Sequence, residues 1–112
     1  MVAGESRSEP PTTQELSGGN SYAEVCAECH GATLGGGKGP PLRGAGFLQS
    51  WKDKPGSELY SRILTTMPAS EPGTLPEETV LNITIYVLSQ NGVDVSSRVK
   101  SPDLLGPITV HR

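Results

Sequence analysis

One face of the segment 57–66 carries most of its apolar side chains. These side chains are Leu59, Tyr60, Ile63 and Leu64. Their spacing of three and four residues places them on the same side of an α-helix. A residue before proline is driven out of helical geometry, and Met67 precedes Pro68. The pattern therefore predicts a helix over residues 57–66 that ends before Met67 and leaves Met67 on a loop.

A second apolar run lies between residues 80 and 88. Several of its side chains are β-branched, which is also typical of a strand. However, the stretch 74–77 reads as a capping box with proline in the first helical turn, and Asn91-Gly92 is a typical helix stop. These signals and the length of the run predict a helix that begins at 74–77 and stops at Asn91-Gly92.

A third helix is predicted to begin at Ser21, because Ser21 and Glu24 have the spacing of a capping box. Two cysteines, Cys26 and Cys29, follow Tyr22 with helical spacing. We therefore expect both thiols on the buried face of this helix.

The remaining stretches are rich in residues that disfavour regular structure. Residues 31–46 include nine glycines or prolines, and residues 1–19 are polar and read as a solvated linker. We predict a flexible N-terminal linker at 1–17, one folded domain at 18–92 and a C-terminal tail at 93–112. All predicted regular elements are helical, so the fold class is all-α.

The stretch Cys26-Ala27-Glu28-Cys29-His30 carries the chemistry. Cys-x-x-Cys-His is the attachment pattern of a c-type haem, in which two thiols form thioethers to the porphyrin and the imidazole reaches the iron. Three other interpretations are weaker. A thioredoxin-like pair lacks its strand and βαβ setting, a zinc site has only His111 as a further ligand, and a disulfide leaves His30 unexplained.

A haem of this kind needs a sixth iron ligand if it carries electrons. A thioether is the usual partner, and the chain has only Met1, at its end, and Met67. We predict His30 and Met67 as the axial ligands; the alternative for Met67 is that it fills a gap in the core.

A haem would also compensate for a composition that has few hydrophobic residues to form a core. Of the 112 residues, 34% are hydrophobic and 4% aromatic, whereas glycine and proline together number 24. This is little material for a core in a single domain. We expect the polypeptide without haem to be poorly folded.

The motifs in their order resemble the class I (mitochondrial-type) cytochromes c. The chain is most similar to small bacterial cytochromes and cytochrome domains that accompany periplasmic quinone-cofactor dehydrogenases and oxidases. The matching stretches are Gly18-x-x-x-Tyr22, residues 26–31, Gly39-Pro40-Pro41-Leu42-x-Gly44, Met67-Pro68 and residues 88–92. They cover residues 18–92.

The resemblance implies a fold of three to five short helices around one covalently attached haem. It implies that Gly18 and Tyr22 let the first helix cross closely over the last one, with Tyr86 as the aromatic partner. It also implies that the carbonyl of Pro40 accepts a hydrogen bond from His30, while Leu42 packs on the haem ring.

Trp51 is the only tryptophan, and two roles are open for it. It either packs in the core beside the haem or donates its indole N–H to a haem propionate. Arg43 is a further candidate for the propionate, against the alternative of a solvated surface residue.

The net charge is −3, but the segment 38–54 is locally basic, with Lys38, Arg43, Lys52 and Lys54 against one acid. These bases either neutralise propionates and face solvent, or dock on an acidic partner surface. No basic helix or aromatic-interleaved basic patch supports nucleic-acid binding.

The function predicted from these residues is one-electron transfer without transformation of a substrate, from a dehydrogenase donor to a terminal oxidase or another cytochrome. One alternative is a haem enzyme or gas sensor with a displaceable sixth ligand. Another is a docking module held to a catalytic partner by its tails.

The sequence contains no membrane-spanning run and no signal peptide at its start. Thioether attachment in this family takes place outside the bacterial cytoplasm. We therefore expect a periplasmic protein whose leader has been removed or that was excised from a longer exported chain. The linker at its start favours excision.

Overall fold

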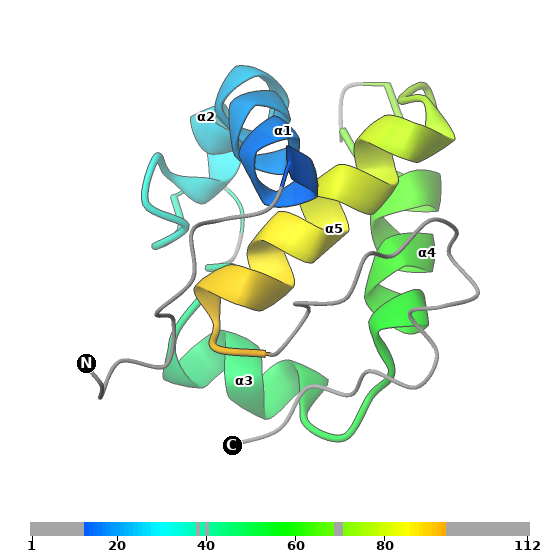
Figure 1. The fold of residues 1–112 in the computed structure, drawn as a ribbon. Helices are drawn as coiled ribbons and strands as arrows, with labels where there is room; N and C mark the ends of the chain where they lie inside the picture. Colours follow the sequence, from blue (N-terminus) through cyan, green and yellow to red (C-terminus); the bar gives the residue numbers. More distant parts are fainter. Residues whose placement is uncertain (1–12, 38, 40, 69–70, 94–112) are drawn as a thin grey trace.

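The computed structural model describes residues 13–37, 39, 41–68 and 71–93 (Figure 1). Its elements, in chain order, are α1 (Thr13–Ser21), a π-helical turn η1 (Tyr22–Cys26), α2 (Ala27–His30), α3 (Ala45–Trp51), α4 (Gly56–Thr66) and α5 (Glu77–Gln90). The described part of the chain contains no β-strand. The all-α prediction is therefore confirmed.

The N-terminal helix α1 lies directly across α5 (Figure 1). Gly18 makes this crossing possible, since a β-carbon at this position would lie 2.0 Å from the carbonyl oxygen of Asn82. One turn further on, the rings of Tyr22 and Tyr86 pack with their centroids 5.7 Å apart at an interplanar angle of 41°. The expected close crossing and its aromatic pair are both present.

The start of the first helix was predicted too late. The helix begins at Thr13 rather than Ser21, and Ser21 makes no side-chain capping hydrogen bond. The additional turns pack on α5 and bury Glu15 and Gly18, so tertiary contacts stabilise a segment whose composition reads as linker. Residues 13–17 of the predicted linker thus belong to α1, whereas 1–12 and the tail 94–112 lie outside the described residues.

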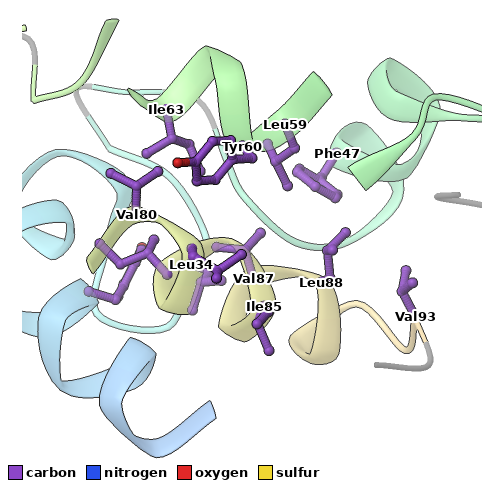
Figure 2. Close-up of a cluster of buried hydrophobic side chains, with 13 residues drawn as sticks. Leu34, Phe47, Leu59, Tyr60, Ile63, Val80, Ile85, Val87, Leu88 and Val93 are labelled. Atoms are coloured by element: carbon purple, nitrogen blue, oxygen red, sulfur yellow. The ribbon is translucent and has the colours of Figure 1, made fainter. Parts of the chain in front are cut away.

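Helix α5 runs through the centre of the core. Val80, Ile83, Val87 and Leu88 are each at most 1% exposed. Figure 2 shows the side chains of α5 packed among those contributed by α3, α4 and the loop that carries Leu34. A helix buried on most sides loses its amphipathic pattern, which explains why its sequence also resembles a strand.

The start of α5 differs from the prediction. Pro76 precedes the first helical residue, Glu77, and no side-chain cap is formed. The hydroxyl of Thr74 instead donates to the carbonyl of Glu71, 2.7 Å away. Thr74 therefore closes the preceding turn and does not cap the helix.

Helix α4 agrees with the prediction to within one residue at its start, and Leu59, Tyr60 and Ile63 are buried. It ends where expected, because Met67 has extended backbone angles, with φ −117° and ψ 152°. Helix α3 was not predicted. Its seven residues bury only Phe47, too few apolar positions to reveal a helical period.

None of the described helices is long and apolar enough to cross a lipid bilayer.

Candidate functional site

The cysteine–histidine motif lies on a continuous helical segment whose geometry changes within the motif. Cys26 ends the π-helical turn η1, and Ala27–His30 forms the single α-helical turn α2. A π-helical turn within an α-helix is frequent at functional sites. Both thiols are free and half-buried, and the His30 side chain is buried.

The chain reverses immediately after His30. Gly31 has a φ of +90°, a value that favours glycine, and its N–H donates to the carbonyl of Ala27 over 2.8 Å. The loop then returns so that the N–H of Gly39 donates to the carbonyl of Cys29, also over 2.8 Å. This reversal brings the backbone of the loop against the imidazole.

Gly39 contacts the His30 ring directly. A β-carbon at Gly39 would lie 2.8 Å from Cε1 and 3.0 Å from Nδ1 of the imidazole, so only glycine leaves the ring in its place. Sequence reasoning matched Gly39 to a family motif but gave it no role. Pro40, the expected hydrogen-bond acceptor for His30, lies outside the described residues.

The motif faces a cleft that Met67 also lines. This cavity of about 200 Å³ is partly open to solvent. Leu42, Trp51, Leu59 and Ile83 contribute apolar surface to it. The structure thus brings six of the predicted site residues to one cleft: Cys26, Cys29, His30, Leu42, Trp51 and Met67.

Met67 reaches the cleft from the end of α4. Its N–H still donates to the carbonyl of Ile63, at 3.1 Å, although its own backbone is extended. Its carbonyl accepts from the N–H of Gly73, at 3.3 Å. The half-buried thioether is therefore attached to a backbone that is held on both sides of the residue.

Cations surround Trp51 at the edge of the cleft. The ring of Trp51 stacks on Phe47, with centroids 6.3 Å apart. Nζ of Lys54 lies 5.4 Å and Cζ of Arg62 lies 5.9 Å from the Trp51 ring, within the range of cation–π attraction. Arg62 lines the cleft, whereas Arg43, the arginine that the sequence analysis considered, is not among the lining residues.

Sequence reasoning missed Arg62. The only signal for it was its position next to Ile63, at the border of the apolar stripe of α4. The Arg62 guanidinium is therefore in a position to bind an acidic substituent of a ligand in the cleft.

Burial changes the acidity of two groups near the motif. It raises the pKa of the Cys26 thiol to about 11, and the nearby Cys29 thiol adds to the effect. Burial also raises the pKa of Tyr22 to about 12, with smaller contributions from Cys26 and Tyr86. The Tyr22 hydroxyl therefore remains protonated and donates to the carbonyl of Gly31 at 2.6 Å.

The chemistry of the cleft fits a haem. Two thiols and an imidazole lie along one helical segment, a thioether comes from another, and apolar side chains line the space they share. Among the described residues, no three His, Cys, Asp or Glu side chains converge to hold a metal ion by themselves. The cleft therefore suits a mostly apolar ligand that already contains a metal ion.

The comparisons with known proteins agree with this chemistry. Residues 13–87 match the family model described as cytochrome c oxidase, cbb3-type, subunit III. No curated protein and no solved structure matches the chain significantly.

Proposed function

Since the chain belongs to the family of cbb3-type cytochrome c domains and therefore carries a covalently bound c-type haem, we propose that it is a one-electron carrier ligated by His30 and Met67. The observation that carries the proposal is the cleft itself, which is lined by both of these side chains together with Cys26 and Cys29. When bound, the haem supplies an iron that alternates between two oxidation states.

We assign the attachment of the haem to Cys26 and Cys29. Their thiols are half-buried, free and face the same cleft as His30. Thioether formation consumes both thiols, so the high pKa of Cys26 affects only the chain before attachment. His30, held by its helical turn and by Gly39, would be the residue of this motif that offers its imidazole to the iron.

The surrounding backbone is suited to electron transfer. Met67 is held by hydrogen bonds on both sides, and Gly39 leaves the His30 ring little room to move. A site that changes little between oxidation states exchanges electrons rapidly, because little free energy is spent on rearrangement. The apolar side chains that line the cleft would limit the access of water to a bound haem, and an apolar environment favours the reduced, less charged state.

The propionates of the haem are best matched to the edge of the cleft near Trp51. Arg62 lines the cleft there, and Lys54 lies on the Trp51 ring. We infer that Arg62 binds a propionate, with Trp51 packing beside it. The indole N–H of Trp51 is a second donor for the same group.

The same cations support a docking role. Lys52, Lys54 and Arg62 are exposed near this edge in a protein whose net charge is negative. An acidic partner surface would be attracted to this edge, mainly through faster association. We propose redox partners of this kind, a dehydrogenase as donor and a terminal oxidase or another cytochrome as acceptor, in the periplasm.

The test is an absorption spectrum of the oxidised and reduced protein, repeated after addition of carbon monoxide to the reduced form. The proposal requires a low-spin spectrum that carbon monoxide does not change. Met67→Ala should free the sixth coordination position of the iron, so this variant should bind carbon monoxide. Leu75→Ala, which truncates a half-buried side chain outside the cleft, is the matched control and should behave as wild type.

A wild-type protein that binds carbon monoxide readily would contradict ligation by Met67. The haem enzyme or gas sensor would then be the better explanation. A Met67→Ala spectrum identical to that of wild type, before and after carbon monoxide, would also contradict the assignment.

A further inference from the structure

Asn91 makes three hydrogen bonds that connect distant parts of the chain. Its Nδ2 donates to the carbonyl of Leu42 and to the carbonyl of Val87, each at 2.8 Å. Its Oδ1 accepts from the N–H of Gly44 at 3.1 Å. Two of these partners are 47 and 49 residues away in sequence, so those two bonds are tertiary, whereas the bond to Val87 is local to the end of α5.

The orientation of the amide is determined by its partners. Two carbonyl oxygens need a donor and one N–H needs an acceptor, so only one of the two possible orientations satisfies all three. The half-buried side chain therefore uses both donors and one acceptor position. No other amino acid of this size offers the same set.

The partners of Asn91 belong to the wall of the haem cleft. Leu42 lines the cleft, and its N–H donates to the carbonyl of the buried Leu34 at 2.8 Å. Gly44 immediately precedes α3, the helix that contributes Trp51 to the cleft. Asn91 thus joins the end of α5 to both sides of a turn in the cleft wall.

This wall needs such support because its own structure is irregular. The described residues between α2 and α3 form turns and bends, with neither helix nor strand to order them. Ordering each residue costs conformational entropy, and ordering a glycine costs more than ordering other residues. Side-chain hydrogen bonds from a buried helix offset part of this cost.

We propose that Asn91 is a positioning residue of the haem site, which holds residues 42–44 against the cleft and thereby keeps water from the haem. The inference rests on the proposed electron-carrier function and gives a role to a residue that the sequence analysis treated only as a helix stop and that does not line the cleft. If this wall loosens, water enters and stabilises the more charged oxidised state, so reduction becomes less favourable.

Two substitutions separate the functions of the amide. Asn91→Asp keeps an acceptor for the N–H of Gly44 but places a carboxylate against the carbonyls of Leu42 and Val87. Asn91→Ala removes all three bonds. Gln90→Glu makes the same amide-to-carboxylate change at the exposed neighbouring residue and is the control.

The first measurement is the reduction potential of the haem-loaded protein. Asn91→Asp and Asn91→Ala should each lower the equilibrium constant for reduction by about tenfold, equivalent to about 59 mV for one electron. Gln90→Glu should change the reduction potential by only a small fraction of that shift. Wild-type potentials in both Asn91 variants would overturn the proposal, even if the variants were less stable.

The second measurement is amide hydrogen exchange, which does not depend on the iron ligands. The Gly44 N–H should exchange at least tenfold faster in Asn91→Ala than in wild type, and should keep more of its protection in Asn91→Asp. Unchanged Gly44 protection in Asn91→Ala would overturn the proposed clamp. Binding of carbon monoxide by the wild-type protein would contradict Met67 ligation instead, so the two failures are distinguishable.

Discussion

The hydroxyl of Tyr22 donates a 2.6 Å hydrogen bond to the carbonyl of Gly31, the first residue after His30. The bond spans the whole attachment motif, because Tyr22 begins the π-helical turn and Gly31 is the C-cap residue that follows α2. The same ring packs on Tyr86 of α5. Tyr22 therefore connects the attachment motif to the central helix of the core.

Removal of this hydroxyl should destabilise the protein. Tyr22→Phe keeps the ring but removes this hydrogen bond, while the Gly31 carbonyl still accepts from the N–H of Leu34 at 3.1 Å. We expect a loss of roughly 0.5–1.5 kcal/mol in the free energy of unfolding. Denaturant titration measures the change. Tyr86→Phe removes a hydroxyl from the other ring of the pair, which is only half-buried, and should cost less. Equal losses in the two variants would argue against a special role for the Tyr22 hydrogen bond.

The same residue predicts a dependence of stability on alkaline pH. The pKa of Tyr22 is raised to about 12 in the folded protein, mainly by burial, from an ordinary value of about 10. The fold therefore favours the neutral phenol. Its contribution is complete below pH 10 and is lost as the pH rises to about 12. Between these values the stability of wild type should fall more steeply than that of Tyr22→Phe. Parallel curves would show that Tyr22 does not titrate in this way.

Substitution of Gly18 should separate α1 from α5. Gly18→Ala places a methyl group 2.0 Å from the backbone oxygen of Asn82, which the helix cannot move cheaply. We expect a loss of roughly 1–3 kcal/mol in the free energy of unfolding. Gly46→Ala is the control. Gly46 lies in α3, and the nearest atom to a β-carbon there would be in the Pro41 side chain, 3.9 Å away. It should be neutral or stabilise by up to about 1 kcal/mol. Similar losses at both positions would contradict the close crossing.

The two cysteines should contribute separately to haem attachment. Cys26→Ser and Cys29→Ser should each leave at most one thioether, and the double variant should retain no haem after denaturation. Intact mass and haem-stained denaturing gels measure this directly. Ser57→Ala, a substitution of a half-buried serine in α4 outside the cleft, should retain haem as wild type does. Covalent haem in the double variant would overturn the assignment.

The cationic edge predicts a salt-dependent reaction with an acidic redox partner. Lys54→Gln should slow the second-order reaction by about two- to threefold at low ionic strength, with a smaller effect as salt is added. Gln90→Glu lowers the net charge by the same amount at the end of α5 and serves as the control. If both variants slow the reaction equally, net charge rather than a docking edge is responsible.

The attachment motif and the end of α4 before Met67 were predicted because each depends on local stereochemistry or on a short fixed spacing. The crossing at Gly18 was expected from the resemblance to class I cytochromes c. The start of α1 and the whole of α3 were not predicted. Thr13–Ser17 is helical because it packs on α5, and no local signal in that segment reports such packing.

The sequence alone determined the chemistry of this protein: two thiols and an imidazole at the spacing of a haem attachment site, with one internal methionine as the candidate thioether ligand. Only the tertiary structure decided what surrounds that chemistry. Gly39 lies on the His30 ring, Arg62 lies at the cleft and Asn91 holds the cleft wall through partners more than 45 residues away. The spacing of residues along the chain determines which side chains are neighbours within one local segment. These contacts instead depend on how separate segments pack against one another.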